Sequence, residues 1–155
     1  MEVVYRIRPF EESDIKSVMD IELTSFIAPW TEEQFLNEYH QNEFANIGVI
    51  EMLLPDSSFK VVGFYDYWVT FDSATIAQIA VHPSYRRNGL ASKMMKEILD
   101  ECYAKRVIAI TLEVRENNEK ARKFYIKSGF EEVLLKPNYY SNGDNAIYMV
   151  KEVEL

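Results

Sequence analysis

The segment "RRNGLAS" at residues 86–92 joins positive charge to small residues where the hydrophobic pattern changes. Before it, residues 74–81 ("ATIAQIAV") have the pattern of a strand, and after it apolar residues recur at helical spacing. A helix N-terminus presents unpaired N–H groups and the positive end of the helix dipole, and Gly89 lets an anion approach the backbone closely. With Arg86 and Arg87 adding charge, the segment predicts a phosphate or pyrophosphate site. The alternative is a surface turn with solvated arginines.

Glu113 is the candidate general base. It closes a strand predicted over residues 106–114 ("RVIAITLEV"), on the face that carries an apolar row by the period of two. A carboxylate at the end of such a row would be partly desolvated, which makes it a better proton acceptor. The alternative is an exposed strand-end glutamate paired with Arg115 or Lys120.

Tyr125 is the candidate general acid. It lies in "KFYIKSGF", on a helix predicted to begin at Asn117 or Asn118 and to end at Gly129. A phenol of ordinary pKa, near 10, can protonate a leaving thiolate whose pKa is about 8.5 at an uphill cost of only about 2 kcal/mol. The alternative is a tyrosine that packs in the core.

Several other kinds of site are not indicated. There is no G-x-G-x-x-G or Walker A motif and no repeated strand–helix–strand unit, so a dinucleotide fold fits poorly. His40 and His82 lack metal-ligand spacing, and the single cysteine, Cys102, falls on an apolar helical face where a buried inert thiol is expected. We therefore predict no metal site.

Composition limits the classes of function. The 155 residues, 48% apolar and 27% charged, fit one globular domain. The net charge of −8 argues against nucleic-acid binding. No apolar run is long enough to cross a bilayer and no secretory signal is evident, so we expect no membrane association. One cysteine makes the cytoplasm the default location.

The order of expected elements is β-α-α-β-β-β-α-β-α-β-β, an α/β (α+β) chain with one mixed sheet of about seven strands. Ser13 is the expected cap of the first helix, and Thr31 with Gln34 predicts a capping box for a second helix over residues 32–41. The strand–helix–strand section at 75–114 predicts two parallel strands. The remaining strands are expected at 3–10, 46–53, 60–71, 130–136 and 145–153.

"RRNGLA" resembles the R/Q-x-x-G-x-G/A signature of the GNAT superfamily of N-acetyltransferases. "QIAVHPSYRRNGLA" and "LEVRENNEKARKFYIKSGF" resemble its RimI-type branch, which acetylates protein N-terminal α-amines. The resemblance covers nearly the whole chain and is strongest over 75–148. It implies a single N-acetyltransferase domain over 1–155, with the GNAT fold and a V-shaped splay between the fourth and fifth strands.

The resemblance also implies that the anion is the pyrophosphate of acetyl-CoA. The cradle would then be Arg87, Asn88, Gly89, Leu90, Ala91 and Ser92. The pantetheine arm would lie against the strand at Ile79, Ala80 and Val81, with the Val81 N–H as oxyanion donor, and Asn118 matches the family asparagine that contacts the cofactor.

The same resemblance implies roles in catalysis and acceptor binding. Glu113 would be the general base, directly or through a water, and Tyr125 the acid. "NYY" would bring Tyr139 and then Tyr140 to the acceptor backbone. In "FIAPW", Phe26 and Trp30 would wall the pocket for the first acceptor side chain. The alternative is that these aromatic residues anchor loops on the core.

The resemblance implies that the acceptor is the N-terminal α-amine of a protein or peptide, with a ribosomal protein among the candidates. An α-amine is roughly a tenth neutral at pH 7, whereas a lysine ε-amine starts about 3 kcal/mol worse off. A lysine or small-amine acceptor, such as a polyamine, and a non-catalytic CoA-binding module are the alternatives. Monomer and homodimer both remain open.

Overall fold

The computed structural model describes residues 2–153, which divide into two compact units. The first unit contains the chain as far as Trp68 together with Ala77–Ile98. The second contains Val69–Ile76 and the chain from Leu99 onward. Each unit is described by itself below, and the expectation of one domain stays a prediction.

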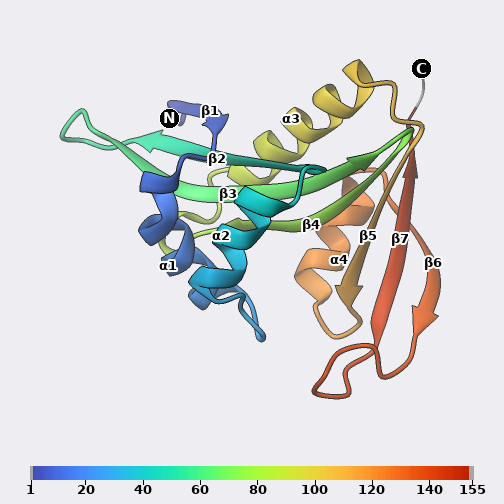
Figure 1. Cartoon of the computed structure of the whole chain (residues 1–155). Helices are drawn as coiled ribbons and strands as arrows, with labels where there is room; N and C mark the ends of the chain where they lie inside the picture. Colours follow the sequence, from blue (N-terminus) through green and yellow to red (C-terminus); the bar gives the residue numbers. More distant parts are fainter. Residues whose placement is uncertain (1, 154–155) are drawn as a thin grey trace. The chain divides into compact units, whose positions relative to one another are not determined.

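The predicted order of elements is confirmed (Figure 1). Seven strands form one mixed sheet in the order β1-β2-β3-β4-β5-β7-β6. No helix within residues 2–153 is long and apolar enough to cross a membrane. The elements are β1 (Tyr5–Pro9), α1 (Ile15–Ser25), α2 (Glu32–Gln41), β2 (Ala45–Leu53), β3 (Phe59–Thr70), β4 (Ser73–Val81), α3 (Leu90–Ala104), β5 (Ala109–Arg115), α4 (Glu119–Lys127), β6 (Glu131–Lys136) and β7 (Ala146–Glu152), with short 3-10 helices at Glu12–Asp14 and Pro83–Tyr85.

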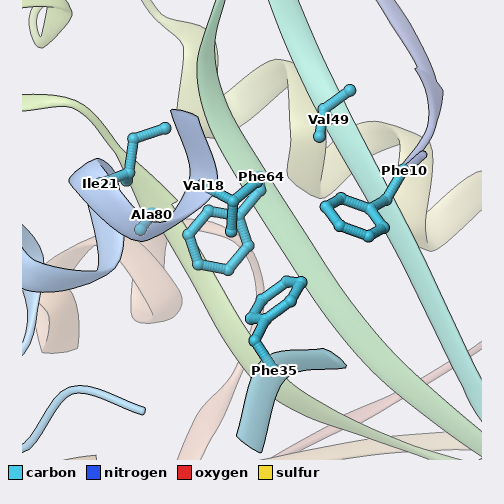
Figure 2. Close-up of a cluster of buried hydrophobic side chains, with 7 residues drawn as sticks. All are labelled: Phe10, Val18, Ile21, Phe35, Val49, Phe64 and Ala80. Atoms are coloured by element: carbon cyan, nitrogen blue, oxygen red, sulfur yellow. The ribbon is translucent and has the colours of Figure 1, made fainter. Parts of the chain in front are cut away.

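The core of the first unit lies between helices α1 and α2 and strands β2, β3 and β4. The Phe35 ring from α2 contacts the rings of Phe10 and Phe64, with centroids 5.3 and 5.6 Å apart. Each buried side chain of this size contributes about 1.5–3 kcal/mol. The packing fixes both helices, and with them the segment that joins α1 to α2, against the sheet. Figure 2 shows the cluster, which comprises Phe10, Val18, Ile21, Phe35, Val49, Phe64 and Ala80.

The second unit is organised around β5. This strand pairs in parallel with β4 over Ser73–Thr75 and Ala109–Thr111, as predicted, and antiparallel with β7 along its whole length. Strand β6 pairs antiparallel with β7. Glu113 therefore lies directly opposite Tyr148. The expected splay concerns the later residues of β4 and β5, which belong to different units, and it stays a prediction.

The two helix starts expected near the N-terminus had different outcomes. The Thr31 capping box is confirmed: its hydroxyl accepts from the Gln34 N–H at 3.1 Å, and the Gln34 side chain accepts from the Thr31 N–H at 2.8 Å. The prediction for Ser13 is wrong, because Asp14 precedes α1 and Ser13 lies inside a 3-10 turn. The Asp14 carboxylate accepts from two nitrogens of Arg8, both at 2.8 Å, which fixes the turn there.

Strand β5 begins at Ala109 rather than at residue 106. Arg106 has a positive φ of 61°, and the Val107 N–H donates to the Cys102 carbonyl at the end of α3. Val107 therefore belongs to the connection that follows the helix, although its side chain is buried as the apolar pattern predicts. The apolar row that leads to Glu113 is shorter than expected by that one residue.

Candidate functional site

The turn between β4 and α3 has the backbone shape expected of an anion cradle. Arg87 and Gly89 both have positive φ, at 70° and 72°. A Cβ added to Gly89 would meet no atom within 4 Å, so the space above this residue is open. The Asn88 side chain donates to the Tyr85 carbonyl at 2.8 Å and fixes the start of the turn. Backbones that alternate in this way present successive N–H groups to one side.

The hydrogen-bond donors of this turn are available. The first N–H groups of α3 have no acceptor within the helix, and no hydrogen bond within residues 2–153 uses the N–H of Gly89, Leu90 or Ala91. Arg87 is exposed, and within residues 2–153 it has no ionic or hydrogen-bonding partner. Leu90 is buried and supplies only its backbone. The turn can therefore receive an anion without breaking a contact.

The neighbouring Arg86 has a structural role. Its Nε donates to the Val81 carbonyl at 3.1 Å, and its Nη2 donates to the Ser25 hydroxyl at 3.4 Å. These bonds tie the turn to the end of β4 and to α1. Of the two arginines in the motif, Arg87 is the one left for a ligand. On β4 itself, Ala80 and Val81 are nearly buried and Ile79 is partly exposed.

Glu22, which the sequence reasoning did not select, organises the segment after α1. Its side chain is fully buried, and Oε2 accepts from the Trp30 N–H and from the Gln78 side chain, both at 3.0 Å. Burial raises the pKa of this carboxyl, and the two hydrogen bonds oppose that rise. Glu22 therefore joins α1, the "FIAPW" segment and β4. The one signal for it is its helical spacing from the apolar Val18.

Trp30 and Phe26 both pack on the core of the first unit. The Trp30 ring lies 6.0 Å from that of Phe35. Trp30 also walls a pocket of about 420 Å³, which is lined by Trp30, Gln34, Asn37, Glu38, Gln41, Asn42 and Trp68. The anchoring role that the sequence left open is thus present, and contact with the first acceptor side chain stays a prediction.

Glu113 has a cationic partner from another strand. Lys136 Nζ donates to Glu113 Oε1 at 3.1 Å, and 27% of the glutamate side chain remains exposed. Its second oxygen, Oε2, is buried and has no hydrogen-bond partner within residues 2–153. The alternative pairing of Glu113 with Arg115 is wrong, since Arg115 bonds Asp144 at 2.8 Å. The β6–β7 register brings Lys136 to the Glu113 carboxylate instead.

The two tyrosines of "NYY" lie in the same group of side chains as Glu113. The Glu113 carboxylate, as a hydrogen-bond acceptor, raises the pKa of Tyr139 to about 12. The rings of Tyr139 and Tyr140 meet edge to face at 5.1 Å. Each ring also makes a cation–π contact: Lys136 Nζ lies 5.2 Å from the Tyr139 ring centroid, and the Arg115 guanidinium lies 3.9 Å from the Tyr140 ring centroid. The structure thus brings both predicted acceptor-binding tyrosines to the candidate base.

Tyr125 lies on α4, and its ring packs edge to face on Phe130 at 5.9 Å. Burial raises the pKa of its hydroxyl well above the ordinary value, and Tyr140 adds to the rise. The hydroxyl is therefore protonated throughout the neutral range but is a weaker proton donor than a free phenol. Donation to a thiolate costs more than the 2 kcal/mol or so that applies to unshifted groups.

Asn118 has a structural role that the sequence also predicted. Its side-chain oxygen accepts from the Ala121 N–H at 3.2 Å and caps α4, while the side chain remains exposed. Gly129 follows this helix with a φ of 100°, as expected of a glycine at the helix C-terminus. The cap leaves the amide nitrogen of Asn118 for another contact, so its cofactor role stays a prediction.

Lys136 and Arg115 could not be assigned from the sequence. Lys136 stands just before "PNYY", at the end of a predicted strand, and Arg115 is the last residue of "LEVR". Neither spacing shows a partner, since the contacts depend on the register between β5, β7 and β6. A cation next to a pair of tyrosines is the one signal that the sequence offers.

Comparison with known proteins gives a consistent result. The sequence model of the family described as Acetyltransferase (GNAT) family matches residues 15–130. A ribosomal protein bS18-alanine N-acetyltransferase of Haemophilus influenzae is 31% identical over 147 residues, covering 92% of this chain and 95% of the relative. The enzyme of that name from Escherichia coli (strain K12) is 29% identical over 152 residues, covering 96% and 98%.

Solved structures agree with these relatives. The crystal structure of the ribosomal-protein-S18-alanine N-acetyltransferase from Escherichia coli superposes with a TM-score of 0.84 at 28% identity, covering 98% of this chain and 96% of that one. The structure of Ard1 from Thermoplasma volcanium gives a TM-score of 0.83 at 32% identity, covering 97% and 99%. The match therefore extends over the whole fold.

Proposed function

Because the chain belongs to the acetyltransferase (GNAT) family, we propose that it transfers the acetyl group of acetyl-CoA to the N-terminal α-amine of a protein or peptide. The observation that carries the proposal is the Glu113 carboxylate. One of its oxygens is held by Lys136, and the other is buried without a partner in the described part of the chain. A buried acceptor without a partner calls for an explanation, and a catalytic role is one that fits this carboxylate.

The turn at residues 86–92 suits the diphosphate of acetyl-CoA. The space above Gly89 is open, and within the described residues the N–H groups of the turn have no acceptors and Arg87 has no partner. These features fit a diphosphate, which carries two negative charges. Ser92 is exposed at the same helix start, and Asn88 helps to shape the turn. When bound, acetyl-CoA supplies an acetyl group activated as a thioester. The residues of this chain would hold the diphosphate, and they would accept and donate the protons of the reaction.

Glu113 would accept the proton that the amine loses as its nitrogen forms the new amide bond. The carbon–sulfur bond breaks, and the released sulfur takes a proton from the Tyr125 hydroxyl or from water. Because the pKa of Tyr125 is raised, this second transfer follows bond cleavage rather than driving it.

The α-amine is favoured over lysine for an energetic reason. A single glutamate base has to remove a proton from an amine that is largely an ammonium ion, and the α-amine starts about 3 kcal/mol closer to neutrality. The names of the Escherichia coli and Haemophilus influenzae relatives, which specify an alanine of ribosomal protein bS18, support an acceptor of this class. A ribosomal protein is accordingly the first acceptor to test.

The test uses purified protein, acetyl-CoA and a panel of peptides that differ in their first residue. Each peptide is paired with a version whose N-terminus is blocked and which carries one internal lysine, and products are read by mass. We expect a single acetyl group on free N-termini and none on the blocked set. Acetylation of blocked peptides at lysine, or of a polyamine in preference to any peptide, would contradict the proposed acceptor.

A further inference from the structure

We propose that Lys136 is a positioning residue that acts through Glu113: its ammonium holds one carboxylate oxygen and so fixes the orientation of the carboxylate that accepts the amine's proton. The inference rests on the proposed function, since it assigns Lys136 to the base of that reaction. It concerns a residue that neither the motifs nor the family signature indicates.

The ion pair spans three adjacent strands. Glu113 lies on β5 opposite Tyr148 of β7, and Lys136 ends β6 opposite Ala146 of β7. The Lys136 ammonium thus reaches across β7 to bond Oε1 at 3.1 Å. About a third of the lysine side chain and 27% of the glutamate side chain are exposed. The pair is therefore mostly shielded from solvent, which strengthens the attraction between the ammonium and the carboxylate.

The ammonium is held in place from more than one side. Lys136 Nζ lies 5.2 Å from the Tyr139 centroid and 5.0 Å from the Tyr148 centroid, in addition to its bond to the carboxylate. In cation–π contacts of this kind the ring face attracts the ammonium. Arg115, the nearest other cation on β5, is committed to Asp144. Lys136 is therefore the cation that orients the Glu113 carboxylate.

The orientation matters because the two carboxylate oxygens are not equivalent. With Oε1 bonded to Lys136, Oε2 lies buried and has no hydrogen-bond partner in the described residues. Without the ammonium, the carboxylate can rotate. The base would then spend less time in the productive orientation, which lowers the chemical rate and leaves cofactor binding unchanged.

A double-mutant cycle on the acetyl-transfer rate tests this coupling. Wild type, Lys136→Met, Glu113→Gln and the double variant are compared for kcat and for the KM of acetyl-CoA. We expect Lys136→Met to lower kcat about tenfold with the KM of acetyl-CoA unchanged. In the Glu113→Gln background the same substitution should have no further effect. Lys136→Arg, which keeps the charge and the donors, should restore most of the rate.

A matched control removes a lysine that has no recorded contact with Glu113. Lys127 lies at the end of α4 in the same unit, and Lys127→Met should leave kcat unchanged. Lys136→Gln serves as a second variant if Lys136→Met unfolds, with the unfolding midpoint of each variant measured in urea. An undiminished kcat in both Lys136 variants, or an equal loss in the Glu113→Gln background, would overturn the inference alone. A wild-type protein that acetylates no free N-terminus would overturn the proposed function and this inference together.

Discussion

The turn at residues 86–92 and the Glu113 group are built in opposite ways. The turn is built from seven consecutive residues, it offers mainly backbone N–H groups, and those donors have no acceptors in the described part of the chain. The Glu113 group draws on β5, β6, β7 and the loop after β6, and its side chains are held by one another apart from a single oxygen. The donors of the turn are thus free in the described part of the chain, whereas the side chains of the Glu113 group already contact one another.

The difference fits the task that we propose for each region. Binding a diphosphate needs several weak donors at fixed spacing, which one stretch of backbone supplies when glycine permits the conformation. Accepting a proton needs one carboxylate in a defined orientation and environment, which only side chains brought together by the sheet can provide. Substitutions in the two regions should therefore affect different kinetic quantities.

The largest expected effect is that of Glu113→Gln, because the amide cannot accept a proton. We expect kcat to fall by about 10²–10³-fold, while calorimetry shows unchanged CoA affinity. A loss of CoA affinity of similar size would break the comparison, since it would assign Glu113 to binding.

Gly89→Ala tests the opposite region. A Cβ at this positive φ costs about 1–2 kcal/mol in the backbone and enters the open space above the turn. We expect CoA affinity by calorimetry to fall about tenfold, with kcat at saturating acetyl-CoA retained. Gly143→Ala is the matched control: it has a positive φ and open space as well, so it should destabilise the fold equally and leave CoA affinity intact.

Tyr125→Phe should have a smaller effect, since a thiolate can leave without prior protonation near neutral pH. We expect kcat to fall about fivefold. The raised pKa of Tyr125 also predicts the pH profile: the acid form persists as the pH rises, so the wild-type rate should not decline between pH 8 and about pH 10. A wild-type decline in that range that Tyr125→Phe abolishes would contradict the raised pKa.

The smallest expected effect is that of Arg87→Ala, which removes one exposed charge from the cradle. Solvent and salt screen such a contact, so CoA affinity should fall about threefold, and less at high ionic strength. Arg86→Ala should differ in kind: it breaks the bond to the Val81 carbonyl and should lower the urea unfolding midpoint. Equal effects of both substitutions on CoA affinity alone would show that the two arginines have the same role.

The contrast also explains what could be predicted from the sequence. The Thr31 capping box, the cap of α4 and the glycine turn depend on residues a few positions apart. The sequence predicted the first and the third, and for the α4 cap it left Asn117 and Asn118 open, of which the structure has Asn118. The first helix start was misplaced because the Arg8–Asp14 pair, and not Ser13, fixes the turn before α1. Lys136 was missed because its contact with Glu113 joins residues 23 positions apart through a strand register that no local pattern contains.

The ion pair between Arg115 and Asp144 affects how the loop that carries Tyr139 and Tyr140 responds to salt. Ionic and guanidinium–ring contacts hold the loop, and the two charged side chains are only 12% and 26% exposed. Because they are largely shielded from solvent, salt should weaken these contacts less than it weakens an exposed pair. With Tyr139 and Tyr140 contacting the acceptor as proposed, the enzyme's order of preference among acceptors should therefore change little with the ionic strength of the assay buffer.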